Sequence, residues 1–274
     1  MDKMEICTKA LSLRKELGEG TTSPIEIFSL ALTIPRLTLV FYPMGDHLSG
    51  MCIKNDGNPV IAINSSMSAG RQRFSMAHEL YHLYFDDSDQ STVCAIKIGV
   101  GNHIEKVADQ FASYFLMPPV ALSEAIKKFQ INNKAKLSIN EIVKLEQYFE
   151  VSRQAILCRL IEEKRITLQQ ADYYRQGVIR SAVNLGYDDC LYRPLPENKQ
   201  YKTYGYYIQQ AEEVLDKELV SNGKYEQLLL SAFRSDLVYG EEFEEGELND
   251  WFSIMEHLQV YYRINRRPSN TIFI

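Results

Sequence analysis

The sequence lacks the features that mark several classes of protein. No stretch approaches the roughly 18 consecutive apolar residues of a membrane helix, so we expect no membrane span. The five cysteines are odd in number and none has Cys-x-x-Cys spacing, which argues against a disulfide framework and a thiolate zinc site. The first 14 residues include acids and no apolar core, unlike a signal peptide. These absences favour a reduced, cytoplasmic protein.

Basic charge is also scarce. The 274 residues contain 30 Lys and Arg against 36 Asp and Glu, which gives a formal net charge of −6. Because the backbone of nucleic acids repels acidic proteins, this balance disfavours a DNA-binding regulator. With 45% apolar and 24% charged residues, the composition is that of a soluble globular protein. The length suits one large domain or two ordinary ones.

The hydrophobic spacing predicts an α+β fold. A small antiparallel sheet is expected to pack on a long helix and on a second helix that ends before Pro118, and a mainly helical region follows. Asn-Asp-Gly-Asn at 55–58 indicates a hairpin turn. In chain order, the expected elements are helices 6–17 and 25–32, strands 37–42, 50–54 and 60–64, and helices 67–85 and 103–116.

The segment His78-Glu79-Leu80-Tyr81-His82 carries the strongest chemical signal. Helical positions four apart lie on one face, with β carbons about 5 to 6 Å apart, so His78 and His82 can bind one Zn²⁺. Glu79 lies beside the metal without binding it, where it can take a proton from the water and return it to the leaving amine. Burying these three polar side chains in an otherwise apolar helix would be costly without a partner. The spacing therefore predicts one catalytic zinc ion per chain.

A catalytic zinc ion also requires a third protein ligand and an open fourth position. The candidates are Glu105, His103 and Asp86. Three ligands in a row on one helix cannot easily surround an ion, which argues against Asp86. We favour Glu105 because Asp109 follows one helical turn later. A carboxylate there can accept the N–H of a metal-bound imidazole as an outer partner.

Substrate contacts are harder to assign. Asn64, at the end of the third expected strand, is a candidate for binding the substrate backbone, and Tyr114 or Arg71 for stabilising the oxyanion. Each has an ordinary structural role as its alternative. The edge of the sheet is a plausible place for a peptide to dock as an added strand.

Two sequence blocks resemble the ImmA/IrrE family of metallo-endopeptidases. They are Arg73-Phe74-x-x-Ala77-His78-Glu79-Leu80-x-His82 and Glu105-x-x-Ala108-Asp109-x-Phe111-Ala112-x-x-Phe115-Leu116-Met117-Pro118. The resemblance covers residues 64–119 strongly and the following helical segment loosely. It implies a gluzincin-like site with His78, His82 and Glu105 as ligands and Glu79 as acid and base. Tyr81 departs from the glycine that is common there in the family; it removes no ligand but puts the width of the cleft in doubt.

Residues 138–148 and 153–161 have the spacing of a helix-turn-helix. Arg153 and Gln154 are of the type that contacts DNA early in the second helix, but Glu146 precedes the turn. We therefore expect this pair to pack on the zinc domain and not to bind DNA.

Three domains are expected: a zinc metallopeptidase domain over 1–130, a helix-turn-helix-like segment packed on it over 131–186, and a region of unknown role over 187–274. In the last region, the tyrosines at 201, 204, 206 and 207 form either an interaction surface or edge packing, and Trp251 is expected to anchor a helix.

The sequence is consistent with two functions. The first is a zinc-dependent endopeptidase that is selective for a regulatory protein, for which the resemblance implies a helix-turn-helix repressor or antitoxin-like partner encoded nearby. The alternative is a catalytically weak zinc-fold scaffold that acts as a toxin–antitoxin or other regulatory binding partner. The intact Glu79 favours the peptidase, because a scaffold needs no general base.

Overall fold

The computed structural model describes residues 2–55, 57–86, 92–95, 98, 102–130 and 137–240. The chain divides into two compact units, Met1–Tyr206 and Tyr207–Ile274. Trp251, predicted to anchor a helix, lies outside the described residues. Within the described ranges, no helix is long and apolar enough to cross a membrane. All five cysteines are free thiols.

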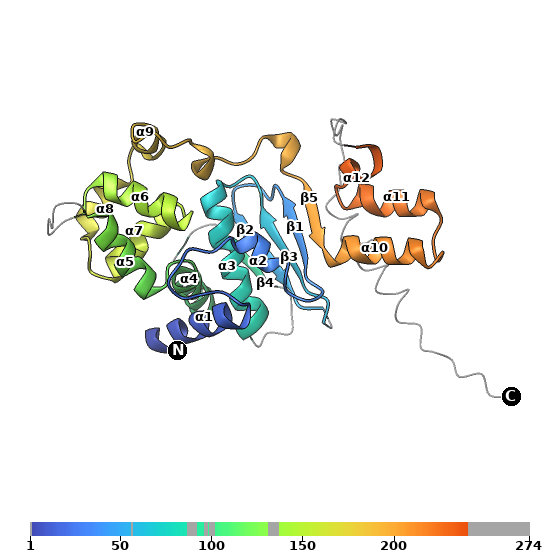
Figure 1. The fold of residues 1–274 in the computed structure, drawn as a ribbon, viewed down its shortest axis with the longest axis horizontal. Coiled ribbons are helices and arrows are strands. Elements are labelled where there is room, and N and C mark those ends of the chain that lie inside the picture. Colours follow the sequence, from blue (N-terminus) through green and yellow to red (C-terminus); the bar gives the residue numbers. More distant parts are fainter. Residues whose placement is uncertain are drawn as a thin grey trace. The chain divides into compact units, whose positions relative to one another are not determined.

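A mixed five-stranded sheet forms one layer of the first unit (Figure 1). Its strands lie in the order β4-β2-β3-β1-β5. The β1–β3 pair is parallel and the other three pairs are antiparallel. The strands are β1 (Thr38–Tyr42), β2 (Leu48–Ile53), β3 (Val60–Asn64), β4 (Thr92–Ala95) and β5 (Lys202–Gly205).

The α+β class is confirmed, and the sheet is largely antiparallel, with one parallel pair, β1–β3. The β2–β3 hairpin forms across the predicted turn, with Gly50 opposite Ile63 and Ile53 opposite Val60. Strand β3 then inserts between β1 and β2. Because β1 and β3 run in the same direction, that insertion makes their pairing parallel.

Strand β5 joins the sheet from far along the chain. Its Tyr204 lies opposite Leu39 of β1, and the Tyr204 ring packs edge-on against Phe41 at 6.0 Å. The strand ends at Gly205, which has a φ of +85° and lies so close to the Leu37 carbonyl that a β carbon would clash with it. Tyr201 packs against Tyr42 in the same way, at 5.3 Å. Two tyrosines of the cluster therefore serve as packing at the sheet edge.

Three helices pack one on another over one face of the sheet (Figure 1). Helix α3 (Ala69–Phe85) contacts β2 and β3, α4 (His103–Leu116) packs on α3, and α1 (Lys3–Glu16) packs on α4. Short helix α2 (Ile27–Ala31) also contacts α3. Helix α4 has the predicted bounds, with Asn102 as its N-cap and Pro118 just beyond its end.

Arg73 fixes the orientation of α3. Its guanidinium pairs with Glu26 at 2.7 Å and with Glu150 at 2.6 Å, and it donates to the carbonyl of Ile25. Because Arg73 is buried, these three acceptors compensate its desolvation. The pairs connect α3 both to the segment before α2 and to the turn of the helix-turn-helix-like pair.

A helical segment follows α4. Helices α6 and α7 form the predicted helix-turn-helix-like pair, with Glu150 in the left-handed region at φ 52° and Ser152 as N-cap of α7. At Gly70 of α3, a β carbon would lie 2.7 Å from the backbone nitrogen of Ser152. The turn of the pair therefore packs directly on the start of α3. The segment comprises α5 (Pro119–Phe129), α6 (Ile139–Phe149), α7 (Arg153–Glu162), α8 (Leu168–Tyr174) and α9 (Val178–Val183).

Arg153 does not face solvent at the start of α7. Its side chain is 4% exposed and forms a bidentate ion pair with Glu146, which is fully buried. It also donates to the Tyr174 carbonyl and to Ser181 Oγ. The basic residue suited to reading DNA is thus used to hold the helical segment together.

The chain continues through two short 3₁₀ helices to a second unit with three helices in its described part. These elements are η1 (Cys190–Tyr192), η2 (Glu197–Lys199), α10 (Tyr206–Asp216), α11 (Asn222–Ser231) and α12 (Ser235–Tyr239). Within the second unit, Tyr207 donates to the Leu228 carbonyl and so ties α10 to α11.

Candidate metal centre

Helix α3 brings two imidazole nitrogens to one point. The Nε2 atoms of His78 and His82 lie 3.2 Å apart, and both side chains are buried. The four-residue spacing places them one above the other on the same helix face, as the sequence predicted. Two Nε2 atoms this close favour either a shared proton or a shared metal ion.

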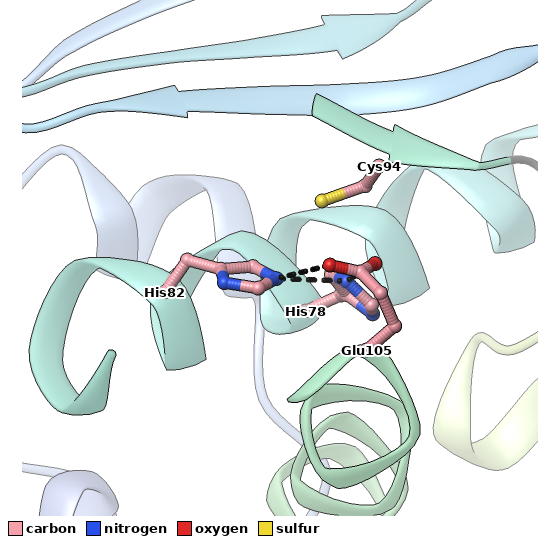
Figure 2. A group of neighbouring side chains, drawn as sticks. All are labelled: His78, His82, Cys94 and Glu105. Atoms are coloured by element: carbon pink, nitrogen blue, oxygen red, sulfur yellow. Dashed lines mark hydrogen bonds and ion pairs between the residues drawn. The ribbon is translucent and has the colours of Figure 1, made fainter. Parts of the chain in front are cut away.

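Glu105 of α4 places its carboxylate beside these two nitrogen atoms (Figure 2). Its Oε2 lies 3.2 Å from His78 Nε2 and its Oε1 lies 3.5 Å from His82 Nε2. The Asn102 side chain accepts a hydrogen bond from the Glu105 backbone N–H at 3.0 Å and so fixes the first turn of α4. The packing of α4 on α3 therefore brings together three ligand atoms from two helices.

The spacing of these atoms fits a metal ion. Two ligands at about 2.05 Å from a tetrahedral ion lie roughly 3.3 Å apart. The three separations of 3.2, 3.2 and 3.5 Å match that value without any rearrangement. Two imidazoles and a carboxylate are also a donor set that zinc takes in hydrolytic sites. The site is therefore suited to a metal ion, while the role of each residue as a ligand stays a prediction.

Both imidazoles are oriented by carboxylates on their other nitrogen. Asp109 Oδ1 lies 2.9 Å from His78 Nδ1, and Asp86 Oδ2 lies 2.9 Å from His82 Nδ1. An Nδ1–H donated to each carboxylate leaves Nε2 free to bind metal. The sequence suggested the position of Asp109. It suggested Asp86 only as a ligand, whereas the structure places it behind His82, on the side away from Glu105.

The surroundings of the two histidines shift their pKa values in opposite directions. Burial disfavours the charged form of His78, but Asp109 and Glu105 outweigh it and raise the pKa of His78 to about 10. For His82, burial dominates, and its pKa is lowered despite the hydrogen bond with Asp86. In the metal-free protein, the raised pKa favours the protonated form of His78.

Glu79 lies beside the ligand atoms and faces the sheet. It is completely buried, and among the described residues no donor reaches either carboxylate oxygen with ordinary hydrogen-bond geometry. Burial raises the pKa of Glu79 to about 7, against the lowering effects of His78 and of the Cys94 thiol. A carboxylate with a pKa near neutrality and unused lone pairs is suited to accept and return a proton.

Three candidate residues do not take part in this group. His103 is exposed at the start of α4 and contributes no atom to it. Tyr114 lies nine residues after Glu105, about two and a half helical turns, and so on the opposite side of α4. There the Arg159 guanidinium packs over its ring at 4.3 Å. Arg71 is close enough to Asp109 for their charges to interact.

Asn64 uses its hydrogen-bonding capacity inside its own loop. Its Oδ1 accepts from the Met44 N–H and from both the backbone and the hydroxyl of Ser66. Its Nδ2 donates to the carbonyls of Gly45 and Leu48. The buried side chain therefore holds the end of β3 against the β1–β2 loop, and no capacity remains for a substrate backbone.

Two residues near the site could not be identified from the sequence. Gly50 of β2 lies directly beneath Glu79, and Cys94 of β4 lies within 4.8 Å of the three ligand atoms. A glycine in a strand and a single cysteine after the active-site helix carry no local pattern. Only the β2–β4 pairing, which places Gly50 opposite Cys94, brings them to the site.

A helix with His-Glu-x-x-His, a carboxylate from a second helix and a buried glutamate beside them are the features of a metallopeptidase type of domain. Comparison with known proteins agrees. Residues 37–160 match the family described as IrrE N-terminal-like domain. Over these residues the match supports the ImmA/IrrE family assignment that the two sequence blocks predicted.

A similar protein is the radiation response metalloprotease IrrE of Deinococcus radiodurans, which is 27% identical over 139 residues. The alignment covers 49% of this chain and 40% of that protein. The chain thus matches less than half the length of this relative.

Proposed function

We propose that this protein is a zinc-dependent endopeptidase that cuts a regulatory protein. The observation that carries the proposal is the pairing of a metal-suited group, formed by His78, His82 and Glu105, with a buried and unpartnered Glu79. A purely structural metal site gains nothing from a buried carboxylate that does not bind the metal. Burying one costs stability, so a catalytic use of Glu79 is the simplest reason for its presence.

The residues divide the chemistry between them. When bound, a zinc ion would lower the pKa of a water and polarise the scissile carbonyl. His78, His82 and Glu105 would hold it, and Asp109 and Asp86 would keep both imidazoles in the required tautomer. Glu79 would accept the proton of the attacking water and deliver it to the leaving amine, for which a pKa of about 7 suits both steps.

The proposed substrate class rests on the family resemblance and on the need for selectivity. We infer that a helix-turn-helix repressor or antitoxin-like regulator encoded nearby is cut, since a peptidase acting in the cytoplasm must be selective to be harmless. A cytoplasmic location is in turn supported by five free thiols and no disulfide among the described residues. DNA binding by this chain is not expected, because Arg153 is occupied by Glu146.

Coexpression of such a regulator with the wild-type chain and with Glu79→Gln tests the proposal. Gln keeps the volume of Glu79 but cannot accept a proton, so a smaller regulator band should appear with the wild type only. Glu124→Gln, on the exposed face of α5, is the matched control and should cleave like the wild type. Equal processing by Glu79→Gln would show that another protease is responsible. Binding of the regulator without cleavage by any variant would favour the scaffold function instead.

A further inference from the structure

A fourth donor lies next to the three predicted metal ligands. The Cys94 sulfur and the ligand atoms of His78, His82 and Glu105 all lie within 4.8 Å of one another. Figure 2 shows the side chain leaving β4 with its sulfur on the side of the sheet where these ligands lie. Cys94 is completely buried, so the thiol is enclosed with the other three groups and shielded from solvent.

The sheet holds Cys94 in this position. Strand β4 pairs antiparallel with β2, and Cys94 lies opposite Gly50. The Ser49 hydroxyl donates to the Cys94 carbonyl at 3.3 Å. Because side chains alternate along a strand, this register directs Cys94 toward α3. The position of the sulfur is therefore set by backbone pairing and does not depend on a flexible loop.

The chemistry and the distances suit a metal–sulfur bond. A thiolate binds zinc at about 2.3 Å, which in a tetrahedral site places the sulfur roughly 3.6 Å from each nitrogen ligand. The group spans no more than 4.8 Å, so a shift of about 1 Å would close the site. The buried Glu79 carboxylate also lies close enough to Cys94 to interact with the thiol, so the sulfur lies between the predicted ligands and the proposed general base.

We propose that the Cys94 thiolate is the fourth metal ligand in the resting protein and occupies the position that the attacking water needs. The proposal rests on the metal site of the proposed function and adds its regulation. As the metal–sulfur bond forms, the thiol releases its proton to solvent. As the bond breaks, the sulfur takes a proton up and a water enters, so the exchange needs no oxidant or reductant.

The position of Cys94 on an edge strand allows a substrate to trigger the replacement of the thiolate by water. Among the described strands, β4 is at one edge of the sheet and pairs only with β2. An edge strand has a free row of backbone groups to which an extended peptide can add. A substrate segment that pairs with β4 is therefore next to the one ligand whose departure opens the site. The resting peptidase stays latent until such a displacement.

Cobalt(II) substitution of the full chain tests the proposal independently of cleavage. A thiolate bound to cobalt(II) gives an intense near-ultraviolet charge-transfer band, which nitrogen and oxygen ligands do not give. We expect the band in the cobalt-loaded wild type and its loss in Cys94→Ser, with one cobalt bound in both. Cys52→Ser is the matched control: Cys52 is also buried, lies on neighbouring β2 and is not a member of the metal group, so its variant should keep the band.

The outcomes separate this proposal from the peptidase function. A cobalt-loaded wild type without the band, or a band that persists in Cys94→Ser, overturns the thiolate ligand and leaves the peptidase function standing. A wild type that binds no cobalt overturns both. Loss of the band in Cys94→Ser supports the ligand even where neither protein cleaves a regulator, and in that case only the peptidase function fails. With cleavage established, Cys94→Ala should process the regulator faster than the wild type, and an equal rate would overturn latency.

Discussion

The backbone of Gly50 lies directly against the carboxylate of Glu79. A β carbon at position 50 would come within 2.7 Å of Glu79 Oε1 and 3.0 Å of the Ala62 carbonyl oxygen. Real β carbons do not approach oxygens this closely, and the Ala62 carbonyl belongs to the adjacent strand. The absence of a side chain at Gly50 is therefore what leaves room for the Glu79 carboxylate, the proposed general base.

Gly50→Ala should move Glu79 without removing a metal ligand. Because displacing a catalytic group by about 1 Å can cost on the order of 10²-fold in rate, we expect a loss of that size in cleavage with metal content unchanged. Cleavage rate and bound metal are measured on the same preparation. Gly223→Ala is the control, since a β carbon there meets nothing within 4 Å. A Gly50→Ala protein with the wild-type rate would contradict the tight fit.

The two outer carboxylates should contribute to metal affinity. Asp109→Ala and Asp86→Ala each remove the acceptor that orients one imidazole, so each should weaken metal binding by roughly 10- to 100-fold while the fold is kept. Competition with a chelator measures this. Asp172→Ala, at an exposed position of α8, should leave affinity unchanged. If either variant bound metal as tightly as the wild type, that carboxylate would be a bystander.

Metal binding should release a proton. With the pKa of His78 raised to about 10, the metal-free protein carries an imidazolium there at neutral pH, whereas a metal ligand must be neutral. The His78 proton competes with the metal below that pKa, so in Cys94→Ser, which has no thiol proton to release, affinity should rise with pH by up to about tenfold per unit between pH 6 and 9. Calorimetry in buffers of different ionisation enthalpy counts the released protons. Affinity that falls as pH rises would contradict the charge assignment.

The Arg153–Glu146 pair should support the stability of the helical segment. Arg153→Ala leaves the fully buried Glu146 without its cation, which is expected to lower the free energy of unfolding by about 3 to 5 kcal/mol. Urea denaturation measures the change. Arg175→Ala, which breaks the exposed pair with Asp172, is the control and should have little effect. Equal destabilisation by the two variants would count against a structural role for Arg153.

The same burial predicts no tight DNA binding. A gel-shift titration with short duplexes should give no salt-dependent complex at sub-micromolar protein. Such a complex, abolished by Arg153→Ala with the fold intact, would show that Arg153 leaves its partner to reach DNA.

Local sequence pattern was enough to predict the parts of the site that lie on helices. The four-residue spacing of His78 and His82 fixes their common face, and Pro118 together with Asn102 fixes both ends of the helix that carries Glu105. These features depend on neighbours within a few residues. Periodicity and capping therefore determine them.

The contributions of the sheet could not be predicted in this way. Strand β5 pairs with β1 across more than 150 residues of sequence, and β3 inserts between β1 and β2 to give a parallel pair. Gly50 and Cys94 reach the site only through the β2–β4 pairing. Asn64, expected near a substrate, has its amide taken up by a loop whose shape depends on that sheet. Long-range pairing has no local signature.

Metal content tests the metal centre most directly, because it needs no substrate. In a protein that also carries Cys94→Ser, Glu105→Ala removes the predicted ligand from α4 and leaves two imidazoles, too few to hold the ion firmly. The matched control is Glu124→Ala, at an exposed position of the next helix. Elemental analysis of the purified proteins should find about one zinc per chain in the wild type, in Cys94→Ser and in Cys94→Ser with Glu124→Ala, and far less in Cys94→Ser with Glu105→Ala. Zinc at the wild-type level in the protein with both Cys94→Ser and Glu105→Ala would contradict the ligand set on which the proposed peptidase rests.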